Sequence, residues 1–189
     1  MASSAPDRLS PRAREIVTAA REILEQEGPE ALSMRRIAES LGIRAPSIYK
    51  HLPDKDALEA AIISTGFEEQ AALFEAAIAT SDDPLGALAC AYRDFACDHP
   101  HLYRLMTERA LNRELLVPGS EERVALPLYQ ATGENLDLAR AAWAFAHGMT
   151  ILELNHRFPP DADLDAAWRH GIDALRLSAT SQGLDSPPT

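Results

Sequence analysis

Apolar residues recur along the chain with helical spacing, and no segment alternates between apolar and polar residues for long enough to predict a strand. Proline and glycine interrupt this pattern at intervals, as they do at helix ends. The pattern therefore predicts an all-α fold. The expected helices cover about 11–27, 34–41, 43–52, 84–97, 99–112, 121–133, 135–157 and 163–180, together with a long helix that begins at Lys55.

Residues that favour helix ends support the helix starts and ends predicted within the first sixty residues. Ser10, Ser33 and Asp54 each stand immediately before a predicted helix, where a side-chain oxygen can accept a hydrogen bond from a free backbone N–H group. Gly28 and Gly42 stand just past helix ends, where a left-handed backbone is common. The first sixty residues are thus expected to hold short helices with short connections.

Residues 33–52, SMRRIAESLGIRAPSIYKHL, form two short amphipathic helices joined by a turn around Gly42. The small side chain of Ala38 lets the two helices approach, and Ile48 returns to fill the space between them. This arrangement is typical of a helix-turn-helix motif. The alternative is an ordinary antiparallel helix pair within a helical bundle.

The outward face of the second helix is polar or aromatic and carries no acidic residue. DNA binding requires cations and hydroxyl groups at phosphates, and hydrogen-bonding side chains at base edges. We therefore expect one set of side chains near the major groove and another at the phosphates. The groove candidates are Arg44, Ser47 and Lys50, and the phosphate candidates are Ser33, Tyr49, His51 and Lys55.

Charge is unevenly distributed along the chain. The net charge is -11, yet residues 1–60 contribute only -1 of it and residues 61–189 contribute -10. The acidic balance argues against attraction of nucleic acid to the whole surface, but it does not exclude a local DNA-binding surface. Four more arginines would add to the positive field there: Arg12, Arg14, Arg35 and Arg36.

The segment ALSMRRIAESLGIRAPSIYKHLPDKDAL, with the arginine-bearing helix and the Gly28 break before it, resembles the N-terminal domain of the tetracycline-repressor-like family of bacterial transcription regulators. The resemblance covers about residues 10–60. It implies that Tyr49, His51 and Lys55 meet the DNA backbone, while residues near Arg44, Ser47 and Lys50 approach bases. Pro46 departs from the small polar residue more usual in the family.

The expected organisation is a DNA-binding domain at 10–57, an effector-binding and dimerisation domain at 58–181, and flexible tails at 1–9 and 182–189. The two parts share a long helix that crosses the change in charge near residue 60. No run of 18 or more apolar residues could span a membrane, and the N-terminus lacks the apolar stretch of a secretory signal. A soluble, cytoplasmic protein is expected.

Helix 135–157 is apolar almost all round, so it must be covered on two sides. One side can face the core and the other a second copy, which predicts a homodimer resembling the four-helix interface of the family. The interface candidates are Phe145, Leu152, Trp168, Ile172 and Leu175. Two reading heads about 34 Å apart would suit a pseudo-palindromic operator. The alternative is a monomer in which the last helix simply covers helix 135–157.

Trp143, His147 and Gly148 follow the pattern W-x-x-x-H-G, which resembles a Trp-His-Gly signature branch of the family. The functional interpretation is a polar anchor in an apolar effector pocket. The pocket candidates are Phe95, Tyr103, Met106, Trp143, His147 and Met149. The alternative is a core histidine packed beside a tryptophan.

The sequence gives little support for a metal site or for redox chemistry. Cys90 and Cys97 are too few for a disulfide scaffold or a four-ligand zinc site, and both are expected to be buried thiols. Asp98, His99 and His101 surround a proline and indicate an exposed helix start rather than a metal site. No metal or other cofactor is predicted.

These patterns favour a ligand-responsive transcription regulator, a repressor without enzymatic activity, that binds an operator as a dimer and is released by a small apolar effector. One alternative is a constitutive DNA-binding dimer, which a filled core without a cavity would favour. Another is an enzyme that uses a cavity in the C-terminal part. The chain contains no G-x-S-x-G elbow and no P-loop, which counts against the enzyme.

Overall fold

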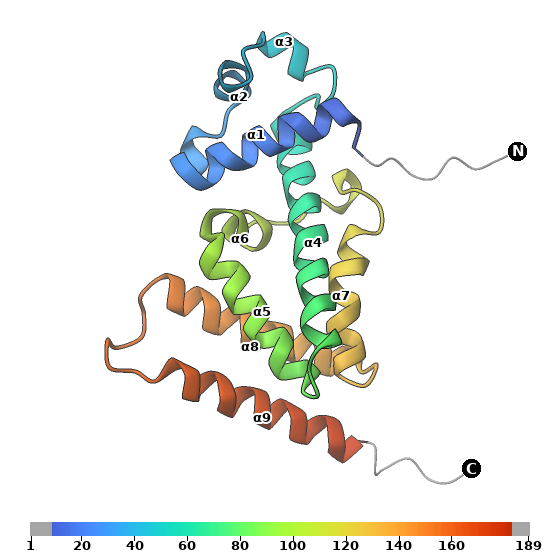
Figure 1. Cartoon of the computed structure of the whole chain (residues 1–189), viewed down its shortest axis with the longest axis vertical. Helices are drawn as coiled ribbons and strands as arrows, with labels where there is room; N and C mark the ends of the chain where they lie inside the picture. Colours follow the sequence, from blue (N-terminus) through green and yellow to red (C-terminus); the bar gives the residue numbers. More distant parts are fainter. Residues whose placement is uncertain (1–8, 183–189) are drawn as a thin grey trace, which may run out of the picture. The chain divides into compact units, whose positions relative to one another are not determined.

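A computed structural model describes residues 9–182, and all of its regular secondary structure in that range is helical (Figure 1). The predicted all-α fold is confirmed. The helices are α1 (Pro11–Glu27), α2 (Met34–Ser40), α3 (Ala45–Ile48), α4 (Lys55–Ala79), α5 (Pro84–Asp98), α6 (Pro100–Thr107), α7 (Ser120–Ala131), α8 (Leu136–Leu154) and α9 (Leu164–Gln182), with short 3-10 turns η1 (Pro29–Ala31) and η2 (Arg113–Leu115).

The predicted N-caps are confirmed at atomic detail. The backbone N–H of Ala13 donates to Ser10 Oγ at 3.2 Å, and that of Arg36 donates to Ser33 Oγ at 3.2 Å. The N–H of Ala57 donates to Asp54 Oδ1 at 2.8 Å. Each bond satisfies a donor that the helix itself leaves free. The starts of α1, α2 and α4 are therefore set by local side-chain chemistry.

The described chain divides into two compact units. One comprises residues 9–69 with His99–Arg123, and the other Gln70–Asp98 with residues 124–182. The expected boundary between 57 and 58 separates functions rather than compact units and stays a prediction, and α6 packs on α1 inside the first unit. A hydrogen bond from the Leu102 N–H to Glu25 Oε1, 3.1 Å long, fixes that contact. The predicted tails, 1–9 and 182–189, lie almost entirely outside the described residues.

The first unit is built on the apolar faces of its helices. The spacing predicted for α1 places Ile16 and Leu24 in the core, fully buried, and α6 contributes the fully buried Tyr103. Ile37 of α2 and Ile48 of α3 are fully buried as well. Because helix–helix packing buries these side chains, this core holds the two short helices in place although neither is long enough to be stable alone.

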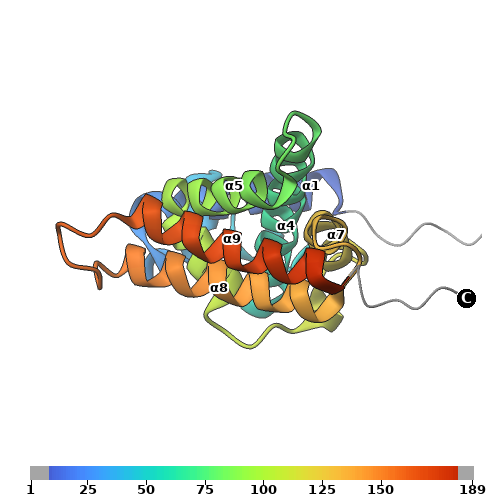
Figure 2. The same cartoon turned by 90° about the horizontal axis from the view of Figure 1, so that it is seen from below.

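The second unit packs α5, α8 and α9 against one another, and Figure 2 shows α8 and α9 lying side by side. The ring of Phe145 meets the edge of Trp168 at a centroid distance of 5.6 Å. Gly171 leaves the room that this ring needs, because a Cβ there would lie 2.0 Å from the Phe145 ring. The small residue in the last helix therefore permits the close approach of α8 and α9.

An arginine ties the same three helices together. Arg93 of α5 donates to both oxygens of Glu153 at 2.8 and 2.7 Å and to Asp165 Oδ1 at 2.6 Å. Its guanidinium also lies 5.9 Å from the centre of the Trp168 ring. These hydrogen bonds raise the pKa of Arg93 and lower the pKa of Asp165. Through these ion pairs, Arg93 holds α5, α8 and α9 together.

Two expectations, one in each unit, were wrong. The helix expected at 99–112 ends at Thr107, because the chain leaves the helical path at Glu108 and continues through irregular backbone to η2. The thiols of Cys90 and Cys97 are exposed rather than buried, because they lie on the outer face of α5.

Between residues 9 and 182, none of the helices has the length and hydropathy needed to cross a bilayer.

Candidate nucleic-acid interface

Helices α2 and α3 form a tight pair within the first unit. The N–H of Ile43 donates to the carbonyl of Ala38 at 2.9 Å, and Gly42 adopts a left-handed backbone with φ of 63° to make the turn. Ile37 of α2 and Ile48 of α3 are fully buried in this helix pair, and Leu52, just after α3, is buried as well. The helix-turn-helix motif read from residues 33–52 is therefore present as a packed unit (Figure 1).

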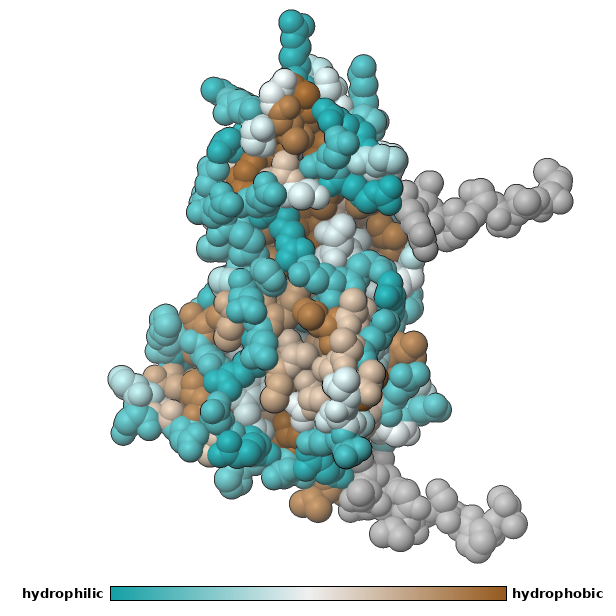
Figure 3. Space-filling model, in the orientation of Figure 1, coloured by the Kyte–Doolittle hydropathy of each residue, from teal (hydrophilic) through white to brown (hydrophobic). Residues whose placement is uncertain are grey.

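The outer face of α3 and the turn after it carry the predicted contact residues. Arg44, Lys50 and His51 are exposed, and the Tyr49 side chain is unusually open for an aromatic residue, with 49% of its surface accessible. Ser47 is half-buried at the same face. Figure 3 shows hydrophilic side chains around a small hydrophobic area over α2 and α3. All five lie in α3, at its two caps or in the two residues that follow, and four of them are exposed.

Ser33 and Lys55, the other two phosphate candidates, lie at the starts of two helices. The Ser33 oxygen accepts the α2 capping bond, which leaves its hydroxyl hydrogen able to donate. Lys55 is the first residue of α4 and is half exposed, with Nζ 3.6 Å from Glu59 Oε1. A helix N-terminus favours an anion electrostatically, so a cation and a hydroxyl at two such ends suit phosphate binding.

Most of the arginines expected to enlarge the positive field have carboxylate partners instead. Arg35 Nε lies 2.9 Å from Glu39 Oε1, Arg36 Nε donates to Glu27 Oε2 at 3.1 Å, and Arg12 pairs with Glu15. The Arg36 pair lowers the pKa of Glu27 and raises the pKa of Arg36. Since exposed pairs are weak, Arg35, almost fully exposed, can still turn to a phosphate.

The predicted effector residues divide between the two units. Trp143, His147, Met149 and Phe95 belong to the second unit, where the Trp143 and His147 rings lie 6.2 Å apart. Phe95 is buried, whereas 52% of the Trp143 surface is exposed. The other two, Tyr103 and Met106, are buried in the first unit. Trp143 and His147 therefore lie near each other because they are one turn apart on α8.

The predicted interface residues also fall into two groups. Trp168 and Ile172 are buried within the protomer, so their burial does not depend on a second copy. Phe145 and Leu175 are half-buried, and Leu152 keeps 41% of its surface exposed. Sequence reasoning missed Leu136, an exposed apolar residue seven positions before Trp143 and hence on the same face of α8.

A packed helix-turn-helix whose exposed face bears cations, hydroxyls and a tyrosine defines a DNA-binding protein. Comparison with known proteins agrees. Residues 16–62 match the model of bacterial regulatory proteins of the tetR family, and residues 85–175 match a tetracycline-repressor-like C-terminal domain. The chain therefore carries the N-terminal and C-terminal domains of TetR-family transcription regulators.

Individual relatives are consistent with this assignment. An uncharacterized helix-turn-helix transcriptional regulator of Mycobacterium tuberculosis is 28% identical over 174 residues, which cover 87% of this chain and 78% of the relative. A protein of unknown function from Rhodococcus sp. RHA1 has the same fold, with a TM-score of 0.74, 24% identity, and coverage of 91% of this chain and 97% of the other. The multidrug binding protein EbrR, complexed with imidazole, shares it at a TM-score of 0.64 and 24% identity, with coverage of 95% and 98%.

Proposed function

We propose that the protein is a ligand-responsive repressor that binds a pseudo-palindromic operator as a homodimer and is released by a small apolar effector. The observation that carries the proposal is the exposed face of α3, where Arg44, Tyr49 and Lys50 stand clear of the core that holds them. A cationic, aromatic surface held on a rigid helix pair suits the major groove and its phosphates. Regulation would then consist of blocking or releasing the operator.

A dimer follows from the apolar surface of the second unit. Phe145 and Leu152, seven residues apart and hence on one face of α8, leave apolar surface exposed in the single chain, and Leu175 of α9 is only half-buried. A second copy related by a two-fold axis would cover them and present two reading heads to one operator. Half-sites about 34 Å apart would match successive turns of the major groove.

The effector proposal rests on the Trp143–His147 pair. The W-x-x-x-H-G pattern places a flat ring and a polar ring one turn apart, which supports membership of the Trp-His-Gly branch and suits an apolar ligand with one polar group. EbrR, which shares the fold, is a multidrug binding protein. We expect the effector to bind best to a conformer whose two DNA-binding domains are wrongly spaced for the operator. The effector then weakens DNA binding, and DNA weakens effector binding by the same factor.

Fluorescence anisotropy tests the operator. The purified protein is titrated onto DNA from immediately upstream of its own gene and onto a shuffled fragment, at two salt concentrations. The proposal expects nanomolar, salt-sensitive preference for the upstream fragment, which is then used to screen small apolar molecules for release. Equal weak binding to both fragments would contradict autoregulation and send the search to genome-wide binding selection.

The two classes of DNA contact should respond differently to substitution. Tyr49→Phe combined with Lys55→Ala removes a hydroxyl and a cation from the phosphates, so affinity should fall by about tenfold on operator and random DNA alike, and the salt slope should flatten by about one. Arg44→Ala should instead cost about 1–3 kcal/mol on the operator and change the preferred sequence. Binding isotherms on both DNAs at several salt concentrations separate the two results.

Glu122→Gln serves as a control, because it removes an exposed charge from α7 and touches none of these residues. It should leave sequence preference intact. If all three variants bound operator and random DNA as the parent does, the contact assignment would be wrong.

A further inference from the structure

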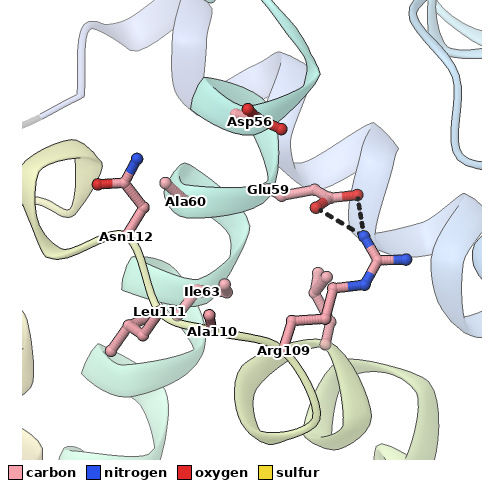
Figure 4. Close-up of a pocket in the computed structure, with 9 residues that line it drawn as sticks. Asp56, Glu59, Ala60, Ile63, Arg109, Ala110, Leu111 and Asn112 are labelled. Carbon is pink, nitrogen blue, oxygen red and sulfur yellow. Dashed lines mark hydrogen bonds and ion pairs between the residues drawn. The ribbon is translucent and has the colours of Figure 1, made fainter.

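A hollow of about 220 Å³ lies within the first unit, between the first two turns of α4 and the segment that follows α6 (Figure 4). Its polar rim is formed by Asp56, Glu59, Arg109 and Asn112. Drug-sized sites usually have about 300–1,000 Å³, so this hollow suits a smaller molecule. No function assigned above uses it.

Glu59 is the centre of the polar rim. Its side chain is 14% exposed, and its carboxylate accepts hydrogen bonds from Arg109 Nη1 at 3.2 and 3.4 Å. Lys55 Nζ also lies 3.6 Å from Glu59 Oε1. Two cations from different segments thus share one carboxylate, and one of them is the lysine proposed to bind a phosphate.

Asp56 adds a second carboxylate to the same rim. It lies three residues before Glu59 and therefore on the same face of α4 (Figure 4). Among residues 9–182, Asp56 has no ion-pair partner. Arg109 and Lys55 both pair with Glu59, so the charges around the hollow balance in number, but Asp56 keeps a carboxylate with which neither cation forms an ion pair.

The wall of the hollow is apolar. Ala60 and Ile63 of α4 are both buried and line one side, and Leu111 contributes from the segment after α6. Short aliphatic chains bury favourably against such surfaces, at about 25 cal/mol per Å². The lining thus combines a cation-binding end with an apolar one.

We propose that this hollow binds a small organic cation, an alkylammonium or alkylguanidinium whose charged head lies between Asp56 and Glu59 and whose short chain lies against Ile63 and Leu111. The bound cation neutralises Glu59 and so frees Lys55 to contact a phosphate. It therefore acts as a co-ligand of DNA, with an effect opposite to that of the releasing effector. This second step rests on the proposed DNA contact of Lys55.

Isothermal titration of the full-length protein with n-pentylammonium chloride tests the site without DNA. We expect millimolar binding, no binding of 1-pentanol, and a loss of about tenfold or more in the Asp56→Asn, Glu59→Gln double variant, because two charged partners are removed. The matched control, Glu122→Gln, should bind as the parent does. Equal binding of the alcohol, or unchanged binding by the double variant, would overturn the site.

A second variant guards against a loss caused by misfolding. Arg109→Met removes the cation that competes for Glu59 while keeping a flexible apolar chain, so it should bind pentylammonium about threefold more tightly. A gain of binding is not an outcome of a damaged fold. Weaker binding by this variant would contradict the proposed position of the charged head.

The coupling to DNA is measured separately, at constant ionic strength. Saturating pentylammonium should raise DNA affinity about threefold in the parent and leave it unchanged in Lys55→Ala, because one ion pair is released for a phosphate. Cation binding without this gain would overturn the coupling. Absence of any preferred operator would count against the proposed function, whereas the titration without DNA would still decide the site.

Discussion

Replacing Ile48 by aspartate should unfold the helix-turn-helix and abolish DNA binding. Ile48 is fully buried where α3 packs on α2, so a carboxylate there would have neither water nor a partner. The lost packing alone costs about 2–5 kcal/mol, and the buried charge adds to it. Domains are stabilised by only about 5–15 kcal/mol in total. Urea unfolding followed by circular dichroism, with anisotropy on DNA, measures both effects.

Two matched variants separate stability from contact. Ile48→Val should cost only about 0.5–1.5 kcal/mol and keep DNA binding, because it removes one methylene. Tyr49→Asp introduces the same charge one residue later, on the exposed face, so it should keep the unfolding midpoint and lose DNA binding. An Ile48→Asp protein with the parental midpoint would show that α3 is not anchored as described.

Trp168→Ala should be the most damaging substitution in the second unit. The ring is buried, meets Phe145 edge to face, and lies under the guanidinium of Arg93. Large aromatic residues replaced by alanine in a core cost about 3–5 kcal/mol. Denaturant unfolding should therefore show a lower midpoint. Trp168→Phe should be milder, because the indole N–H has no hydrogen-bond partner to lose among the described residues.

Leu152→Ala distinguishes packing within the protomer from contact between copies. This side chain is exposed in the single chain, so its truncation should leave the unfolding of a dilute protomer nearly unchanged. If α8 covers itself with a second copy, the same change should raise the dimer dissociation constant, measured by analytical ultracentrifugation. The opposite pattern, with a large loss of protomer stability, would contradict the exposed position.

The helix starts could be predicted because they depend on neighbouring residues. Ser10, Ser33 and Asp54 cap helices through bonds to groups three residues away, and the sequence displays that spacing directly. The inward positions of α2 and α3 followed from the same local periodicity. The face proposed to bind DNA consists of the positions that remain outside, so it could be proposed from the sequence as well.

What the sequence could not provide depends on distant segments. Glu59 and Arg109 are fifty residues apart, and nothing in either neighbourhood indicates that they meet. The end of α6 at Thr107 follows from the path of the chain rather than from periodicity, since residues 108–112 include good helix formers. Cys90 and Cys97 seven positions apart indicated a shared face but not whether that face was covered.

An almost wholly apolar helix presents a related limit. The composition of α8 required cover on two sides, yet it did not say which side the protomer itself covers. The fold buries Ala142 and Ala146 and leaves Trp143 exposed between them in sequence. The small residues lie inside because they allow the neighbouring helices to approach closely, and the largest side chain lies outside.

The shortness of α3 limits how much sequence information the protein can take from DNA by direct contact. Four residues span about 6 Å, which is roughly two base pairs of B-form DNA, and the turn after the helix extends this to about three. Two heads would then specify about six positions, a pattern that recurs by chance roughly every 4,000 base pairs and hence hundreds of times among the 10⁶ or more sites of a genome. Selectivity must therefore come from the spacing of the two half-sites and from the stiffness and groove width of the DNA between them, at positions that no side chain touches.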